Sequence, residues 1–366
     1  MKPKEEIVHL PVYQPGKPIE EVKRELGLED ITKMASNENP YGCSPKVQEA
    51  VISKLNYTHI YPDGASTELT QALSKFHNVE ENQLIFGAGS DEVILMIARA
   101  FLVRGDETIM AEQTFPQYRH NAVIEGAVCL EVPLKAGTHD LQGMLNKVTD
   151  KTKVIWVCNP NNPTGTMVTH QEIKQFIESV PSHVLIVLDE AYYEYNVSSN
   201  YPDSLGLLQE HKNIVLLRTF SKIYGLASLR IGFGIGHPEI IRYINQVREP
   251  FNTTTFAQAA AVAALQDQEF IEHCKKQNAE GITYLTSEFT GMDLTYFPAH
   301  GNFIMLHLNR PAELVFDALL RKGIIVRGGH KLGFPASIRV TVGTPQQNTK
   351  FIETLKSVLS EISVLV

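Results

Sequence analysis

Cysteine is scarce in this chain of 366 residues, and its four cysteines lie far apart in the sequence. Cys43, Cys129, Cys158 and Cys274 form no Cys-x-x-Cys pair, so neither a structural zinc site nor a disulfide framework is indicated. We expect reduced thiols with mainly structural roles.

A long hydrophobic run and an excess of basic charge are also missing. No segment approaches the apolar length of a membrane span, and the first residues lack the apolar core of a signal peptide. The formal net charge is -8, and acidic and basic residues are interspersed, so no basic stripe predicts binding to nucleic acid. We therefore expect a cytoplasmic protein that binds neither membranes nor nucleic acid.

Internal repeats and low-complexity segments are absent as well, and strand-like and helix-like runs alternate between about residues 84 and 236. This alternation predicts an α/β domain with parallel strands, because parallel strands need helical crossovers. Seven strands are expected there, at residues 83–86, 108–111, 128–132, 154–157, 184–188, 214–217 and 231–235. Helices are expected between them at residues 91–101, 117–124 and 171–180.

The pattern changes after residue 236. Long helices are predicted at residues 239–247, 256–265 and 269–289, and the last of them is a plausible bridge between domains. A second unit follows, with strands at residues 303–308, 324–327 and 338–342 and helices at residues 312–322 and 348–362. We predict a large domain over residues 32–280 and a small α+β domain from residues 1–31 and 281–366, with the Pro-rich N-terminal arm packed on the small domain.

Lys222 lies among small and polar residues after the apolar strand predicted at residues 214–217. In open α/β sheets, ligands bind beyond the carboxyl ends of the strands, so this amine lies where a site is expected. A single lysine at a strand end is more often a solvated charge, and its position alone does not establish a chemical role.

Other polar residues follow neighbouring strands. Asn162 lies in an Asn-Pro turn, a pattern that marks loops in many proteins. Asp189 ends an apolar strand and needs a cationic or hydrogen-bonding partner to be stable as an anion. A metal is one such partner, with Glu190 and Glu194 nearby, but no histidine or acid at ligand spacing supports it.

The segment Gly87-Ala88-Gly89-Ser90-Asp91 joins a strand to an amphipathic helix through small residues. Its backbone amides and the positive end of the helix suit a phosphate, although the same segment also suits a simple helix cap. The glycine spacing departs from Gly-x-Gly-x-x-Gly and no Walker motif is present, so nucleotide binding is disfavoured.

In chain order, the strand ends carry the phosphate cradle, Asn162, Asp189 with Tyr192, and Lys222 with Arg230, an order that resembles the fold-type I pyridoxal-phosphate aminotransferases. The resemblance implies pyridoxal 5'-phosphate and a large domain whose mostly parallel seven-stranded sheet lies between helices, next to the small α+β domain. Lys222 would be the Schiff-base lysine and proton shuttle, and Asp189 would keep the pyridine nitrogen protonated. Asn162 and Tyr192 would hydrogen-bond the ring oxygen.

The catalytic residues implied by this resemblance are Lys222, Asp189 and Tyr192. The implied cofactor site consists of Gly89, Ser90, Asp91, Phe115, Asn162, Asp189, Tyr192, Thr219, Ser221, Lys222 and Arg230. Asp91 would act mainly through its backbone amide, because its carboxylate would repel the phosphate. Phe115 would stack on the pyridine ring, at a position where many relatives carry tyrosine.

The resemblance covers nearly the whole chain and is closest to the histidinol-phosphate aminotransferase family. The motifs that carry it are Asn37-Glu38-Asn39-Pro40-Tyr41-Gly42, Tyr61-Pro62-Asp63-Gly64, Thr114-Phe115-Pro116-Gln117-Tyr118, Arg248-Glu249-Pro250-Phe251-Asn252 and Ile338-Arg339-Val340-Thr341-Val342-Gly343. It also implies a homodimer in which Tyr61 reaches the cofactor phosphate bound by the partner subunit.

Arg339 lies in an otherwise apolar strand, where a guanidinium without a partner would be costly, so a bound anion is expected. The resemblance implies that Arg339 binds the α-carboxylate of glutamate and that Arg339, Arg327, Tyr13 and Asn302 bind the phosphate of histidinol phosphate. Asn37 completes the implied substrate site. A solvated Arg327 is the alternative, and it would not favour a phosphate substrate.

The implied reaction is amino-group transfer between L-histidinol phosphate and 2-oxoglutarate, giving imidazole acetol phosphate and glutamate in histidine biosynthesis. An aromatic amino acid aminotransferase would share every cofactor residue, and a phosphothreonine-type decarboxylase would break a different bond at Cα in the same site. A non-enzymatic pyridoxal-phosphate sensor or regulatory module would be expected to lose the lysine or add a DNA-binding domain, and neither feature is seen.

Overall fold

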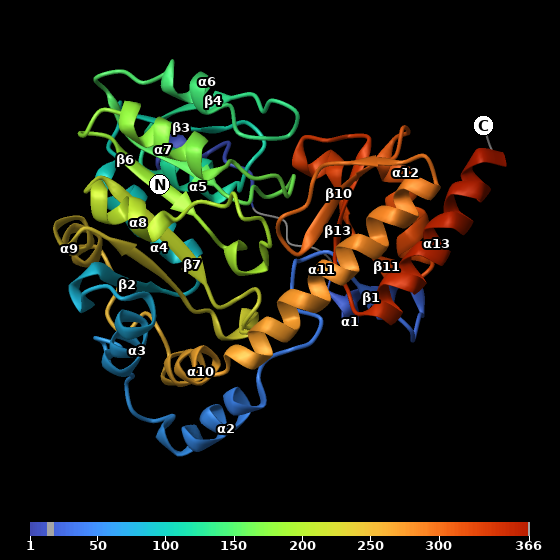
Figure 1. Cartoon of the computed structure of the whole chain (residues 1–366), viewed down its shortest axis with the longest axis horizontal. Helices are drawn as coiled ribbons and strands as arrows, with labels where there is room; N and C mark the ends of the chain where they lie inside the picture. Colours follow the sequence, from blue (N-terminus) through green and yellow to red (C-terminus); the bar gives the residue numbers. More distant parts are fainter. Residues whose placement is uncertain (13–17, 365–366) are drawn as a thin grey trace.

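The computed structural model describes residues 1–12 and 18–364 and consists of a larger and a smaller body. The long helix α11 (Gln268–Gly291) runs from the larger body to the smaller one, as Figure 1 shows. The predicted bridging helix is therefore confirmed.

A seven-stranded sheet forms the centre of the larger body, in the order β2-β8-β7-β6-β5-β3-β4. Its strands are β2 (Leu84–Gly87), β3 (Glu107–Ala111), β4 (Val128–Val132), β5 (Thr152–Cys158), β6 (Leu185–Asp189), β7 (Ile214–Thr219) and β8 (Gly232–Gly236). Only β8 runs antiparallel to its neighbours β2 and β7. The structure thus confirms the mostly parallel seven-stranded sheet.

Side chains of the central strands alternate between two apolar layers, because successive residues of a strand point to opposite faces. On one face, Ile186 and Leu188 of β6 pack in the layer covered by α2 (Pro45–Ser53), α3 (Thr67–His77), α7 (His170–Ser179), α8 (Ser204–Glu210) and α10 (Thr255–Leu265). On the other face, Leu185 and Val187 pack under α4 (Ser90–Phe101), α5 (Gln117–Ile124) and α9 (Pro238–Gln246). Both faces of the sheet are therefore buried, and polar side chains such as that of Asp189 lie at the ends of the strands.

The smaller body contains a four-stranded antiparallel sheet in the order β12-β13-β10-β9. These strands are β9 (Thr295–Tyr296), β10 (Phe303–His307), β12 (Arg327–Gly328) and β13 (Ser337–Thr341), and α12 (Ala312–Arg321) and α13 (Pro345–Val364) complete this body. The strand predicted at residues 324–327 is divided. Its first half, β11 (Ile324–Ile325), pairs with β1 (Thr32–Lys33), and its second half, β12, pairs with β13.

The N-terminal arm contacts both bodies. Val22 of α1 (Ile19–Leu26) is buried against Ala35 and Ile325, as expected for packing on the small domain. The first residues instead lie on the larger body, where Lys4 donates to the Ile124 carbonyl of α5 at 3.3 Å. The prediction that the whole arm packs on the small domain is therefore wrong for its beginning.

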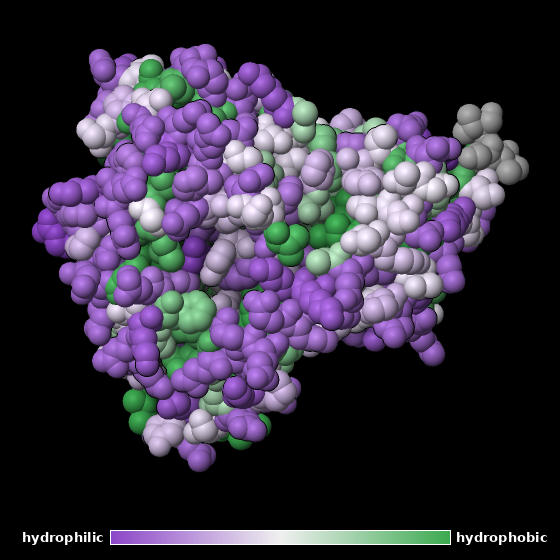
Figure 2. All heavy atoms as spheres, in the orientation of Figure 1, coloured by the Kyte–Doolittle hydropathy of each residue, from purple (hydrophilic) through white to green (hydrophobic). Residues whose placement is uncertain are grey.

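The surface in Figure 2 is mainly hydrophilic, with hydrophobic side chains in small groups. Among residues 1–12 and 18–364, no helix combines the length and the apolar character needed to cross a membrane.

Candidate functional site

A cavity of about 300 Å³ lies at the carboxyl ends of β5, β6 and β7. It is lined by Ala35, Ser36, Asn37, Gly89, Ser90, Asp91, Phe115, Gln117, Cys158, Asn162, Asp189, Ala191, Tyr192, Thr219, Ser221, Lys222, Arg230, Arg327 and Arg339. The structure thus brings together all predicted site residues except Tyr13, Tyr61 and Asn302.

These three residues have different locations. Tyr13 lies outside the described residues. Asn302 is buried, and its side-chain amide donates to the carbonyl of Asn37 at 3.1 Å, so it supports a lining segment without lining the cavity itself. Tyr61 is 79% exposed and stacks on Phe251 with 4.7 Å between the ring centroids. Its surface position leaves it accessible to a partner subunit.

Lys222 presents its amine to the cavity. Its Nζ donates to the Ser36 carbonyl at 3.5 Å. Burial, and next the positive charge of Arg339, lower the pKa of Lys222 to about 8. The chain turns sharply after this lysine, and a Cβ on Gly225 would lie 1.9 Å from the Gly42 carbonyl, so only glycine fits that turn. The result is a lysine that is partly neutral near physiological pH and therefore able to act as a nucleophile.

Asp189, at the end of β6, is 3% exposed. Its Oδ2 accepts a hydrogen bond from the Tyr118 hydroxyl at 2.6 Å, and its Oδ1 accepts one from the Ala191 amide at 3.2 Å. Burial raises the pKa of Asp189 to about 6, and the two hydrogen bonds oppose that shift. Both donors are neutral, so a cation in the cavity would stabilise the ionised carboxylate further.

An anion cradle forms where α4 begins. Arg230 donates from Nη1 to the Ser221 hydroxyl at 3.3 Å and forms an ion pair from Nη2 with Asp91 at 3.3 Å. Gly89 has φ of +80°, which favours glycine, and a Cβ there would lie 2.5 Å from Arg230 Nη2, so a side chain at this position would displace the guanidinium. The helix N-terminus, the hydroxyls of Ser90 and Ser221 and the guanidinium together suit a phosphate.

Tyr192 and Asn162 each accept one hydrogen bond from another side chain of the protein. Asn37 donates from Nδ2 to the Tyr192 hydroxyl oxygen at 3.0 Å, which leaves the tyrosine proton to be donated elsewhere. Arg339 donates from Nη1 to Asn162 Oδ1 at 2.6 Å, which leaves the amide nitrogen of Asn162 as a donor. Both side chains can therefore donate to a single acceptor in the cavity.

Arg339 has neutral hydrogen-bond partners within the protein, and the bound anion expected for it stays a prediction. This guanidinium is 7% exposed and already donates to Asn162 and, at 2.8 Å, to the Ala35 carbonyl. These neutral partners come from distant parts of the chain, so the local sequence contained no sign of them. Arg339 still lines the cavity, where its charge can attract an anionic substrate.

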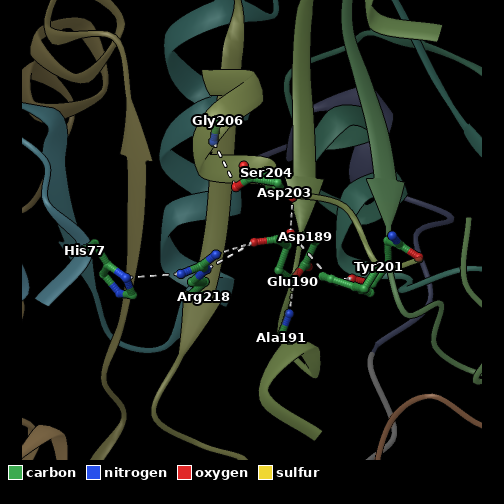
Figure 3. Close-up of polar contacts among 10 residues, drawn as sticks. His77, Asp189, Glu190, Ala191, Tyr201, Asp203, Ser204, Gly206 and Arg218 are labelled. Carbon is green, nitrogen blue, oxygen red and sulfur yellow. Dashed lines mark hydrogen bonds and ion pairs between the residues drawn. The ribbon is translucent and has the colours of Figure 1, made fainter. Parts of the chain in front are cut away.

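Beside Asp189, Glu190 belongs to a separate buried network (Figure 3). Arg218 of β7 binds Glu190 Oε2 through Nε at 3.0 Å and Nη2 at 2.9 Å, and the Ser204 hydroxyl donates to Oε1. Arg218 Nη1 donates to His77 Nδ1 at 3.3 Å, and burial lowers the pKa of His77 to about 3. Glu190 thus pairs with arginine, and the described residues contain no group of three or more His, Cys, Asp or Glu able to hold a metal ion.

Five residues that line the cavity, and one residue that supports Asp189, were not predicted from the sequence. The missed lining residues are Ala35, Ser36, Gln117, Cys158 and Ala191. Ser36 and Ala191 contribute backbone groups, which have no signature in the side-chain pattern. Tyr118 lies within a motif that was recognised, but its contact with Asp189 depends on the packing of α5 on the sheet.

Comparisons with known proteins agree with this geometry. The family model of aminotransferase class I and II matches residues 29–355. Histidinol-phosphate aminotransferase of Brevibacillus brevis is 52% identical over 360 residues, covering 98% of this chain and 99% of that protein. The protein of the same name from Geobacillus sp. (strain WCH70) is 54% identical over 363 residues, covering 99% of both chains.

Solved structures give the same result. Histidinol-phosphate aminotransferase from Sinorhizobium meliloti in complex with pyridoxal-5'-phosphate has a TM-score of 0.90 at 25% identity and covers 98% of each chain. L-threonine-O-3-phosphate decarboxylase from Porphyromonas gingivalis has a TM-score of 0.78 at 21% identity, covering 90% of this chain and 100% of that one, and shows the shared fold alone. The chain belongs to the class I and II aminotransferases and, among them, to the histidinol-phosphate aminotransferase family.

Proposed function

We propose that this protein transfers an amino group between L-histidinol phosphate and 2-oxoglutarate with pyridoxal 5'-phosphate as cofactor. The products are imidazole acetol phosphate and glutamate. The observation that carries the proposal is one cavity that joins a half-buried, partly neutral lysine, a buried carboxylate and an anion cradle. It occurs in a chain that is 52% and 54% identical to relatives named for this reaction.

The residues of the cavity fit each part of the cofactor. The carboxyl of Asp189 has only neutral donors among its described hydrogen-bond partners, and a protonated pyridine nitrogen would supply the missing cation. The cradle of Ser90, Ser221 and Arg230 fits the phosphate, and Phe115 lines the cavity as an aromatic side chain that could stack on the ring. When bound, the cofactor supplies an electrophilic aldehyde and an electron sink for negative charge at Cα.

The protein's own groups would handle the protons. Lys222 Nζ would hold the cofactor and then carry the proton that leaves Cα of the substrate. The hydroxyl of Tyr192 and the amide nitrogen of Asn162 would donate to the ring oxygen, because their other polar atoms are engaged by Asn37 and Arg339. Asp189 would keep a proton on the pyridine nitrogen.

The two arginines of the small domain favour a doubly charged substrate. Arg339 and Arg327 both line the cavity, which favours a pocket-facing Arg327 over a solvated one. Both also line an adjoining cavity of about 580 Å³, which is lined by Lys331 as well. Two cations suit the phosphate of histidinol phosphate and the carboxylates of glutamate, whereas a plain aromatic amino acid needs only one. Roles for Tyr13 and Asn302 stay predictions.

We also propose that the protein is a homodimer. Tyr61, the residue predicted to act in the partner subunit, is exposed and stacks on Phe251, which is also exposed. Four more exposed apolar side chains precede Tyr61 in the chain: Ile52, Leu55, Tyr57 and Ile60. Monomeric proteins seldom expose such a group of large apolar side chains without a binding role. The domain boundaries and the cytoplasmic location also remain proposals.

Substrate preference can be tested by supplying 2-oxoglutarate with one amino donor at a time and measuring glutamate. We expect kcat/KM for histidinol phosphate to exceed that for phenylalanine or tyrosine by about 100-fold, because each charge-assisted contact contributes about 1.5–3 kcal/mol. Release of carbon dioxide from phosphothreonine checks the decarboxylase alternative. Glutamate formation from phenylalanine but not from histidinol phosphate would contradict the proposal.

Substitution of Arg327 separates the substrates. Arg327→Gln should lower kcat/KM for histidinol phosphate by about 10-fold to 100-fold while leaving that for phenylalanine nearly unchanged. Lys222→Ala is the inactive control, and it should also lose the visible absorption of lysine-linked cofactor.

A further inference from the structure

Tyr118 is the group that supports Asp189 from behind the cavity. It lies on α5, is completely buried, and donates its hydroxyl to Asp189 Oδ2 at 2.6 Å. Its ring also packs against Phe115 in a T-shaped arrangement, with centroids 5.7 Å apart and planes at 77°. One tyrosine therefore contacts both the carboxylate and the aromatic ring that the cofactor would meet.

The position of this hydroxyl is fixed by a chain of buried contacts. The Tyr118 ring stacks on Trp156 with centroids 5.0 Å apart and planes 12° apart. Trp156 Nε1 donates to Thr108 Oγ1 at 2.8 Å, and the Thr108 hydroxyl donates to the Val154 carbonyl at 2.9 Å. Tyr118, Trp156 and Thr108 are all inaccessible to solvent, so the hydroxyl is held by close packing against the sheet.

The direction of this hydrogen bond follows from the chemistry of the two groups. Burial, and next the charge of Asp189, raise the pKa of Tyr118 well above its ordinary value, so the phenol keeps its proton and acts as the donor. Asp189 Oδ2 must then accept, which favours the ionised carboxylate.

The other titratable groups that face Asp189 come from several elements. Cys158 ends β5, Asp91 lies on α4, and Glu190 and Tyr192 follow β6. Asp91 and Glu190 raise the pKa of Asp189 through their negative charges, while burial keeps the Cys158 thiol protonated. The Tyr118 hydroxyl is therefore the side chain that most directly opposes protonation of Asp189.

We propose that Tyr118 is a positioning residue that holds Asp189 as an ionised acceptor and so keeps the shared proton on the pyridine nitrogen of the cofactor. This inference rests on the proposed function. Loss of the Tyr118 hydrogen bond would move that proton toward Asp189 and weaken the ring as an electron sink. Tyr118 would thus influence the reaction without touching the substrate or the cofactor.

The test compares wild-type protein and Tyr118→Phe, each loaded with cofactor labelled with ¹⁵N at the pyridine nitrogen. The phenylalanine ring can keep its contacts with Trp156 and Phe115, so the variant removes only the hydroxyl. We expect its ¹⁵N signal to move toward the value of unprotonated pyridine. We also expect kcat to fall about 10-fold, with KM for histidinol phosphate changed less than about twofold, because the lost interaction lies away from the substrate.

The matched control is Tyr195→Phe. Tyr195 is also buried, and its hydroxyl has no hydrogen-bond partner in the described part of the chain. This variant should keep the wild-type ¹⁵N signal and kcat. If Tyr118→Phe does not fold, 4-aminophenylalanine in place of Tyr118 gives a weaker donor of similar shape, and the ¹⁵N signal should move part of the way toward the value of unprotonated pyridine.

The possible failures can be distinguished. A wild-type protein that shows a protonated pyridine nitrogen and full activity, together with an unchanged signal and kcat in Tyr118→Phe, would overturn the role of Tyr118. An unchanged signal in the 4-aminophenylalanine protein would do the same. A wild-type protein that neither binds the cofactor nor transfers amino groups would instead overturn the proposed function.

Discussion

At the scale of single residues, burial changes the acid–base behaviour of Lys222. Its pKa is lowered to about 8 by burial and by the charge of Arg339. Only the neutral amine attacks an aldehyde, and at pH 7 about a tenth of the lysine is neutral. The rate at which cofactor-free protein captures pyridoxal phosphate should therefore rise with pH and reach half its maximum near pH 8.

Rapid-mixing absorbance measurements check this pH profile. Arg339→Gln removes a charge that lowers the pKa of Lys222, so its profile should shift to higher pH. A wild-type rate that is half-maximal only near the ordinary lysine pKa of 10.5 would show that Lys222 is not buried in the way described.

Single residues also show how much of the site can be predicted from the sequence. Asn162, Asp189 and Lys222 were predictable because each follows an apolar strand, and strand ends of one sheet meet at one edge. The contacts of Tyr118 with Asp189 and of Ser36 with Lys222 were not predictable. They depend on a helix packed on the sheet and on a backbone carbonyl from a distant segment, and neither appears in a local pattern.

At the scale of elements, the pair Glu190–Arg218 joins the ends of β6 and β7, the strands that carry Asp189 and lead to Lys222 (Figure 3). Both side chains are almost fully buried. Glu190→Ala would leave the Arg218 guanidinium without its carboxylate and should lower the free energy of unfolding by about 3–5 kcal/mol. Urea denaturation of the cofactor-free protein measures this change.

An exposed ion pair gives the matched control for that prediction. Lys174 and Glu210 lie 3.8 Å apart at the surface, so Glu210→Ala should change the free energy of unfolding by less than about 1 kcal/mol. Equal losses in the two variants would mean that the buried pair has no special part in holding β6 and β7.

Elements with a strong apolar pattern were the ones predicted correctly. The strands β3, β5, β6 and β7 consist mostly of buried apolar residues, and they lie within a few residues of their predicted bounds, as do the helices α4 and α5. The helices α2, α3 and α8 went unpredicted, although α3 buries Leu69 and Leu73 on one side. The division of residues 324–327 between two sheets depends on which strands lie beside them, which no local pattern reveals.

At the scale of the whole molecule, the site is assembled from both bodies. The larger body supplies the strand ends, the cradle and Lys222, whereas Arg327 and Arg339 lie on β12 and β13 of the smaller body. The segment that contains Asn37 joins them, since its backbone amide donates to Thr341 at 2.9 Å and its side chain donates to Tyr192. The residues proposed to hold the cofactor and the two arginines proposed to bind the substrate thus share a cavity only because the two bodies are packed together.

The proposed dimer extends this assembly across two chains and can be tested by complementation. Lys222→Ala is expected to be inactive, and Tyr61→Phe should bind the cofactor about 10-fold more weakly while its ring can still stack on Phe251. In a heterodimer of these variants, one site combines an intact Lys222 with the partner's Tyr61. Random pairing should therefore restore about a quarter of wild-type activity at limiting cofactor, because half of the dimers have one intact site.

The same experiment tests the alternative that Tyr61 acts in the cofactor site of its own chain. In that case every site in the mixture would lack either the lysine or the tyrosine hydroxyl, and activity would not exceed the average of the two variants measured separately.

Leu55→Asp introduces a charge among the exposed apolar side chains that precede Tyr61 in the chain and should shift the protein from dimer to monomer in light scattering. Because a monomer cannot receive Tyr61 from a partner, this variant should also lose cofactor affinity by about the same 10-fold as Tyr61→Phe.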